Sequence, residues 1–197
     1  MCLRKPLKKI AEFENDFHNM INDIDNDTVV LFEDESYIRD YQALCATWCL
    51  KGKQRKIKTY GQHKGVGLFG VLDYINGNII VEAAEQLNAQ SFQDFLEHKV
   101  LPAFKNKKII MILDNGKIHH AKCLAEFKEL HKDQLIFMFL PPYAPAINRI
   151  EGLWKWLKHN AIHNRFLKGI NEIRDAVHCF ISAIRLKRNI IRKRLCW

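Results

Sequence analysis

The chain has 197 residues, of which 48% are hydrophobic, and its 31 Lys and Arg against 22 Asp and Glu give a formal net charge of +9. This length is enough for one domain that buries a core without disulfide staples. No apolar run approaches the roughly 20 residues of a membrane span, and no apolar signal segment follows Met1. The positive charge favours nucleic acid as a partner over an anionic membrane surface, and we expect no membrane partner.

The elements predicted from hydrophobic periodicity alternate between helix and strand. In chain order they are a helix at 3–24, strands at 28–32, near Trp48, at 66–74 and at 78–82, a helix at 91–104, a strand at 108–113, a helix at 118–131, a strand at 135–140, a helix from Asn148 to about His163, and a final, interrupted helix over 170–195. The strands at 66–74 and 78–82 flank Asn76-Gly77, which predicts a hairpin.

The order of these elements is that of the ribonuclease-H-like α/β fold. Early strands that can pair antiparallel are followed by helix, strand, helix, strand and helix, which predicts a mixed five-stranded sheet flanked by helices. We expect a helical lead-in at residues 1–26 and one domain at 27–197 that ends in C-terminal helices.

Three acidic residues lie at the ends of predicted apolar elements. Asp34 follows the first strand, Asp114 follows the strand ending at Leu113, and Glu151 lies near a helix start. The carboxyl ends of strands in open α/β sheets carry the chemistry, so we expect the three carboxylates to converge. At 4 Å and an effective dielectric near 20, each pair would cost about 4 kcal/mol, and divalent cations such as Mg²⁺ remove that repulsion. This pattern predicts phosphodiester chemistry with two metal ions.

Each acid also has a plainer interpretation. Asp34 can be a solvated strand end, and Asp114-Asn115-Gly116 is good turn chemistry. Asn148-x-x-Glu151 fits a capping box, in which the Glu151 carboxylate reaches back to the helix start. From the residues alone, the capping box is the favoured role of Glu151.

Cysteine and histidine spacing predicts no zinc site. The six cysteines are scattered without a Cys-x-x-Cys pair, as is typical of reduced thiols in an intracellular protein. His159 and His163 are four residues apart on a predicted helix, but Asn160 stands where a His-Glu-x-x-His motif needs glutamate.

Five motifs occur in order between about residue 27 and about residue 180. They are Phe32-Glu33-Asp34-Glu35-Ser36, Thr47-Trp48-Cys49-Leu50-Lys51-Gly52, Phe69-Gly70-Val71-Leu72-Asp73, Leu113-Asp114-Asn115-Gly116-Lys117-Ile118-His119, and Leu140-Pro141-Pro142-Tyr143-Ala144-Pro145 continued by Asn148 to Lys158. Together they resemble the motifs of the DDE transposases of Tc/mariner-like prokaryotic insertion sequences.

The resemblance implies a catalytic domain that cleaves DNA and transfers the cut strand to target DNA. It implies that Asp34, Asp114 and Glu151 bind two Mg²⁺ or Mn²⁺ ions, with Asp34 bound to both, so that one ion activates water and the other stabilises the leaving oxygen. The implied partners are transposon-end and target DNA and a second copy of the chain in a synaptic complex. Relatives carry helix-turn-helix modules before this domain, whereas only about 26 residues precede the first motif here. Two alternatives stay open: a truncated copy, or a separately encoded helix-turn-helix segment as a further partner. The implied location is the prokaryotic cytoplasm, at the nucleoid.

Other residues are expected to bind DNA or to support the site. Asn115 and His119 match family positions that would orient water or phosphate, although His119 in a core is the plainer interpretation. Trp48 and Lys51 match a motif that would face DNA. The basic runs at 51–58 and 185–194 can be ordinary solvated faces, but their density favours phosphate contact. The full set is Trp48, Lys51, Lys53, Arg55, Lys56, Asn115, His119, Lys155 and Lys158.

One departure from the family concerns the segment before Glu151. Relatives usually have Pro-Asp-Leu-Asn-Pro-Ile-Glu there, whereas this chain has Arg149 in place of the second proline, which predicts a less rigid helix start. Two other functions remain open at this point. One is a non-catalytic, basic DNA-binding remnant, and the other is a structure-selective nuclease of the same fold.

Overall fold

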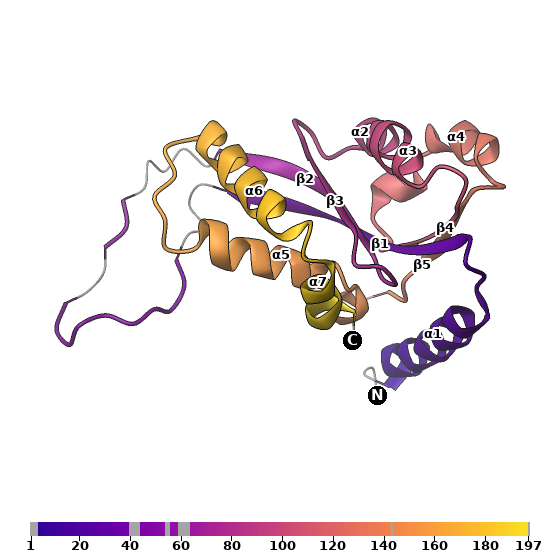
Figure 1. The fold of residues 1–197 in the computed structure, drawn as a ribbon, viewed down its shortest axis with the longest axis horizontal. Helices are drawn as coiled ribbons and strands as arrows, with labels where there is room; N and C mark the ends of the chain where they lie inside the picture. Colours follow the sequence, from indigo (N-terminus) through magenta and orange to yellow (C-terminus); the bar gives the residue numbers. More distant parts are fainter. Residues whose placement is uncertain (1–3, 40–43, 54–55, 59–63, 143, 197) are drawn as a thin grey trace.

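A mixed sheet of five strands forms the centre of the molecule (Figure 1). The computed structural model describes all residues except 1–3, 40–43, 54–55, 59–63, 143 and 197. The strands are β1 (Thr28–Arg39), β2 (Gly65–Asp73), β3 (Ile79–Ala84), β4 (Lys108–Leu113) and β5 (Leu135–Phe139), in the order β3-β2-β1-β4-β5. β1 pairs antiparallel with β2 and parallel with β4, which confirms the predicted mixed sheet.

Helices cover both faces of this sheet (Figure 1). They are α1 (Arg4–Asp23), α2 (Ala89–Phe95), α3 (Leu101–Ala103), α4 (Leu124–Leu130), α5 (Glu151–Leu157), α6 (Ile170–Ile184) and α7 (Arg188–Leu195). A π-helical turn, η1 (Leu96–Val100), joins α2 to α3, and another, η4 (Lys158–Ile162), continues α5. The break between α6 and α7 confirms the interrupted final helix.

The alternation of side chains along β1 separates two hydrophobic cores. Val30 and Phe32 face the core that contains Trp154 of α5 and Ile173 of α6. Leu31 faces the other core, with Phe92 and Phe95 of α2 as neighbours on that side. Because both faces are covered, the first part of β1 is continuously apolar rather than alternating.

The predicted hairpin and lead-in helix are both present. Gly77 in the β2–β3 connection has φ of +70°, a conformation that glycine adopts without steric cost. Asp73 accepts hydrogen bonds from the backbone N–H groups of Ile75 and Asn76, at 3.1 and 3.0 Å, which fixes the turn. Phe17 of α1 packs on Phe32, with ring centroids 5.6 Å apart. The domain boundary after residue 26 stays a prediction.

The strand predicted near Trp48 is wrong. Residues 44–50 form no strand, and the Trp48 side chain is 99% exposed. A strand needs a neighbour to accept its backbone hydrogen bonds, and both sides of β1 are already occupied by β2 and β4. The segment around Trp48 therefore has local β-propensity but no neighbouring strand with which to pair.

Two predicted helices also need correction. The segment 118–131 is not one helix but a 3₁₀ turn, η2 (Lys117–His120), followed by α4, because Ala121 adopts an extended conformation with ψ of 139°. The helix predicted from Asn148 begins at Glu151 instead. Among the described residues, no helix is both long and apolar enough to cross a membrane.

Candidate active site

The end of β4 creates the opening in which the candidate site lies. The parallel pairing of β1 with β4 ends at Phe32 and Ile112, but β1 continues to Arg39. The prediction that Asp34 follows the end of its strand is therefore wrong. Asp34 lies within β1, opposite Gly70 of β2. Its position beyond the last β4 pair still places it at the carboxyl edge of the parallel part of the sheet.

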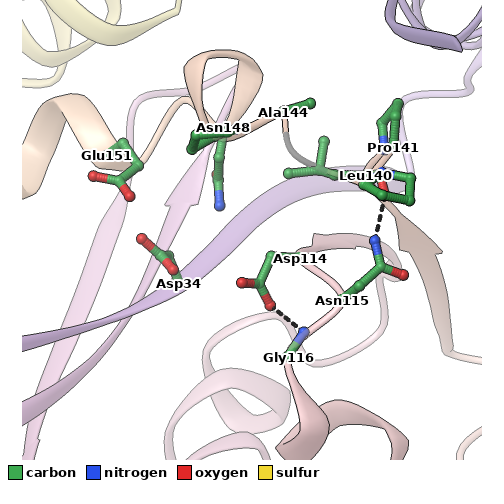
Figure 2. Close-up of a pocket in the computed structure, with 11 residues that line it drawn as sticks. Asp34, Asp114, Asn115, Gly116, Leu140, Pro141, Ala144, Asn148 and Glu151 are labelled. Carbon is green, nitrogen blue, oxygen red and sulfur yellow. Dashed lines mark hydrogen bonds between the residues drawn. The ribbon is translucent and has the colours of Figure 1, made fainter. Parts of the chain in front are cut away.

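The three predicted acids line one cavity of about 440 Å³ at this edge (Figure 2). Asp34 comes from β1, Asp114 from the residue after β4, and Glu151 from the first residue of α5. In Figure 2 the carboxylates of Glu151 and Asp34 point toward each other, and one oxygen of Asp114 points toward Asp34. The other residues that line the cavity are Asn115, Gly116, Leu140, Pro141, Pro142, Ala144, Pro145 and Asn148.

Burial and like charge act together on Asp34. Burial raises the pKa of the Asp34 carboxyl to about 8, with further upward contributions from Glu151, Glu35 and Asp114. A carboxyl group that resists ionisation beside other acids is a site where a cation is strongly favoured. The groups that could hold such a cation are carboxylate oxygens in an open cavity, a donor set that fits Mg²⁺ or Mn²⁺.

Trp154 holds Asp34 in place, a role that the sequence motifs did not indicate. Its indole Nε1–H donates to Asp34 Oδ2 at 3.1 Å while the ring itself is buried. The ring fits there because Gly70 has no side chain, since a Cβ on Gly70 would lie 2.5 Å from the Trp154 ring. The signal was its position three residues after Glu151, on the same helix face.

The Asp114 carboxylate is held by its own turn. Its Oδ1 accepts the backbone N–H of Gly116 at 2.6 Å and lies 3.3 Å from His119 Nε2. The turn chemistry predicted for Asp114-Asn115-Gly116 is therefore present together with a carboxylate that lines the cavity, and the two interpretations of Asp114 are compatible.

The capping-box interpretation of Glu151 is wrong. Asn148 makes no cap, because its Nδ2–H donates to the Glu33 backbone carbonyl at 3.1 Å, and the residue before α5 is Ile150, whose side chain does not cap. Asn148 instead fastens the loop before α5 to β1, next to Asp34. Arg149 lies before the helix, so the helix start does not depend on a proline at that position.

A second acidic group lies on the opposite face of β1. Glu33 is fully buried, and its two carboxyl oxygens have no hydrogen-bond partner among the described residues. His119 Nε2 lies 3.6 Å from Glu33 Oε2 and 3.6 Å from Glu35 Oε1. Burial raises the pKa of Glu33 well above its usual value and that of Glu35 to about 7. This group was not predicted from the sequence. The pattern that could have indicated it is Glu33, an acid at an inward-facing position of an apolar strand.

Comparison with known proteins assigns the family. A model of the DDE superfamily endonuclease family matches residues 29–174. This chain belongs to the DDE superfamily of endonucleases. It is 25% identical over 168 residues to the insertion element IS630 uncharacterized 39 kDa protein of Shigella sonnei, covering 85% of this chain and 48% of that protein. The chain thus spans about half the length of this curated relative.

Solved structures similar to this DDE domain share its fold. The Mos1 transposase paired-end complex with left transposon end matches with a TM-score of 0.69 and 14% identity, over 99% of this chain and 61% of that chain. The catalytic domain of Mos1 mariner transposase matches with a TM-score of 0.62 and 13% identity, over 99% and 92% of the two chains. These likenesses confirm the ribonuclease-H-like fold. The resemblance to Tc/mariner-like DDE transposases is confirmed by the family match and the insertion-element relative together with this fold.

The two residues predicted to support the site, His119 and Asn115, both lie beside its acids. His119 is fully buried behind Asp114, so a contact of His119 with DNA phosphate or bulk water is excluded. Burial lowers the pKa of His119 to about 4, so its imidazole is neutral at pH 7. Asn115 donates its Nδ2–H to the Leu140 carbonyl at 2.6 Å, which links the loops that follow β4 and β5.

The predicted DNA-binding residues of the DDE domain lie on two exposed elements. Trp48, Lys51, Lys53 and Lys56 belong to the connection between β1 and β2, whose described part projects from the body at the left of Figure 1. Gly52, with φ of +78°, turns this segment, and Lys53 N–H donates to the Leu50 carbonyl at 2.9 Å. Arg55 lies outside the described residues.

The other two predicted residues, Lys155 and Lys158, follow Glu151 at helical spacing along α5 and η4. Lys155 is exposed and Lys158 is half-buried. A basic stripe therefore leads away from the acidic cavity along one helical segment.

Proposed function

We propose that this DDE domain is the catalytic part of an insertion-sequence transposase, which cleaves DNA at the element's ends and transfers the freed strand to target DNA. The observation that carries the proposal is the convergence of Asp34, Asp114 and Glu151 on one cavity from three separate elements. The name of the relative as an insertion element protein and the folds of the Mos1 transposase structures support it.

Two divalent ions, Mg²⁺ or Mn²⁺, are the proposed cofactors, with Asp34, Asp114 and Glu151 as their ligands. Mos1 structures with Mg and with Mn support this choice of metals. When bound, such ions would activate the attacking oxygen and stabilise the leaving one.

The other residues of the site would hold these carboxylates in the orientation that metal binding requires. The Trp154 N–H orients Asp34, and the Gly116 N–H fixes one oxygen of Asp114 so that the other points toward Asp34. Asn148 ties the loop that precedes Glu151 to β1. We assign His119 as a positioning residue, because its Nε2 lies 3.3 Å from Asp114 Oδ1, on the buried side of that carboxylate.

The proposed substrate is duplex DNA, both at the element's ends and at the target. The net charge of +9 and the exposed Lys51, Lys53, Lys56 and Lys155 provide phosphate contacts. A second copy of the chain in a synaptic complex is the proposed protein partner. Chromosomal DNA as substrate implies work at the prokaryotic nucleoid, in the cytoplasm.

The test is a nicking assay on supercoiled plasmid with purified protein and Mg²⁺ or Mn²⁺. We expect metal-dependent nicking that Asp34→Asn, Asp114→Asn and Glu151→Gln each reduce by about a hundredfold or more. Asp175→Asn removes an exposed acid of α6 and should leave nicking unchanged. Equal nicking by the three site variants and the parent would contradict the assignment.

A second arm separates transposase from the nuclease alternative. A labelled duplex with a free 3′-hydroxyl is incubated with the protein and a target plasmid. Joined products are expected from a transposase, whereas cleavage without joining identifies a nuclease. Absence of both reactions, with intact folding and DNA binding, would favour the non-catalytic DNA-binding remnant.

A further inference from the structure

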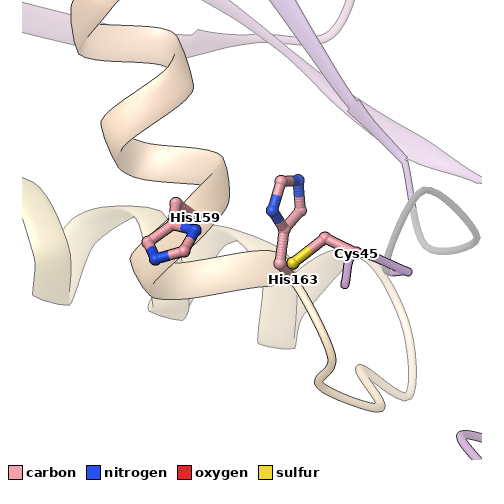
Figure 3. Close-up of side chains that lie close together, drawn as sticks. All are labelled: Cys45, His159 and His163. Carbon is pink, nitrogen blue, oxygen red and sulfur yellow. The ribbon is translucent and has the colours of Figure 1, made fainter. Parts of the chain in front are cut away.

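Two histidines at the end of the helical segment that follows Glu151 lie beside a cysteine from the β1–β2 connection (Figure 3). They are His159 and His163, and the cysteine is Cys45. One donor atom from each side chain lies within 4.8 Å of the donor atoms of the other two. Thiolate and imidazole are the ligands that zinc takes in proteins, whereas Mg²⁺ prefers oxygen. The group is therefore chemically distinct from the carboxylate site.

We propose that Cys45, His159 and His163 bind a zinc ion, which ties the β1–β2 connection to the helical segment that begins at Glu151. Neighbouring ligand atoms around tetrahedral zinc are about 3.3 to 3.7 Å apart. Side-chain rotations that move the donor atoms by about 1 Å would bring the three to these distances. His159 is exposed and Cys45 and His163 are half-buried, which leaves room for that movement. Three protein ligands leave a fourth position for water or another donor.

Asn164 supports the cysteine as a ligand from outside the metal position. The Cys45 backbone N–H donates to Asn164 Oδ1 at 3.2 Å, and Asn164 Nδ2–H donates to Cys45 Sγ at 3.5 Å. Outer contacts of this kind orient metal ligands. The cysteine is thus held facing the histidines.

His163 is suited to bind metal. Its Nδ1 is buried and has no hydrogen-bond partner among the described residues. The spacing of His159 and His163 predicted no zinc site, because Asn160 breaks the His-Glu-x-x-His motif. That motif describes one catalytic arrangement only, and the third donor here comes from a distant segment.

The zinc would have a consequence for DNA contact, and this part rests on the proposed function. Cys45 precedes Trp48 and Lys51 in the β1–β2 connection, while His159 follows Lys158 in η4. A metal bond between the two segments would hold the basic connection in a fixed position relative to the helix that provides Glu151.

The test uses cobalt as a probe for zinc, on reduced, metal-free protein in saturating Mg²⁺, which fills oxygen-ligand sites. We expect Co²⁺ to produce a near-ultraviolet thiolate-to-metal band and tetrahedral visible bands, both removed by one equivalent of Zn²⁺. Cys45→Ser should abolish the thiolate band. Cys49→Ser, which removes an exposed cysteine of the same connection, should retain it. No thiolate band in the parent, or a band that survives Cys45→Ser, would overturn the proposal.

Two further measurements test the role of Asn164 and the link between the β1–β2 connection and the helical segment. Asn164→Gly keeps the positive φ of 58° accessible and should weaken zinc binding by about 10- to 100-fold. Zinc should slow trypsin cleavage after Lys51 and Lys53 in the parent but not in Cys45→Ser. Zinc binding without this protection would overturn the claim that the metal ties the connection to the helix. Both measurements are independent of nicking, so their failure would leave the proposed function untouched.

Discussion

At the scale of single residues, Asp34 carries the strongest electrostatic strain in the carboxylate site. Burial and three neighbouring acids raise the pKa of its carboxyl from 3.8 to about 8. The folded, metal-free chain therefore binds a proton that the unfolded chain releases between these two pH values. Since the native state binds more protons there, ionisation of Asp34 makes the free energy of unfolding fall as the pH rises from about 4 to about 8.

Asp34→Asn should consequently stabilise the metal-free domain, and the gain should grow with pH. Each unit of the relieved pKa shift is worth up to about 1.4 kcal/mol, so a gain of a few kcal/mol is expected above pH 8 and little near pH 4. Urea unfolding of both proteins in a chelator, at pH 5 and pH 8.5, measures the difference. A difference that does not change with pH would show that Asp34 is not under this strain.

Trp154→Phe removes the hydrogen bond to Asp34 and trims the ring that packs on Gly70. Phenylalanine keeps an aromatic ring in the core but removes the N–H that Asp34 accepts. We expect a loss of about 1–2 kcal/mol in the free energy of unfolding, and a fall in nicking of about tenfold beyond the loss of folded protein. Nicking by the folded fraction at the parent rate would mean that the indole only fills space.

At the scale of elements, local pattern predicted most strands and helices but not where they stop. The hairpin and β4 were predictable because turn chemistry and a continuous apolar run are local signals. The extension of β1 to Arg39 was not predictable, because its polar second half is stabilised by pairing with β2 alone. The break after η2 likewise has its cause in burial of His119 behind Asp114, a tertiary contact.

The three acids of the site could be predicted, and the contacts that position them could not. Asp34, Asp114 and Glu151 stand in motifs with a recognisable order. Trp154 had the pattern of an ordinary core residue, and its contact with Asp34 depends on Gly70 in another strand. Pairs of this kind come from packing between elements, which a single sequence does not show.

Gly70→Ala tests the packing of α5 on β2. The added Cβ would lie 2.5 Å from the Trp154 ring, so we expect destabilisation of about 1–3 kcal/mol and displacement of the indole from Asp34. Gly169→Ala is the matched control, because a Cβ there meets nothing within 4 Å. Thermal unfolding and Trp fluorescence report the two effects. Equal behaviour of both variants would contradict the close approach of α5 to β2.

At the scale of the whole molecule, the proposed function assigns DNA binding to the positively charged surface and cleavage to the acidic cavity. The exposed lysines of the β1–β2 connection offer phosphate contacts, which position a protein without reading sequence. We therefore expect this chain alone to bind duplex DNA weakly, with Kd of about 10⁻⁴ to 10⁻⁶ M at physiological salt, and with little sequence preference.

Replacing Lys51, Lys53 and Lys56 together by Ala should flatten the salt dependence of binding. Each lost phosphate contact lowers the slope of log K against log salt by about 0.9, so a change of up to about 3 is expected. The control replaces three other exposed lysines, Lys9, Lys105 and Lys132. Fluorescence anisotropy at several salt concentrations measures both. Equal slopes for the two triple variants would remove the β1–β2 connection from the DNA interface.

The most direct test of the two-metal site is anomalous diffraction from crystals of this chain that contain Mn²⁺. The proposed function predicts two manganese peaks roughly 3.5–4 Å apart in the cavity lined by Asp34, Asp114 and Glu151, and their loss in crystals of Asp34→Asn. An empty cavity in well-diffracting crystals at saturating Mn²⁺, or peaks that remain in Asp34→Asn, would contradict the assignment of these carboxylates as the metal ligands.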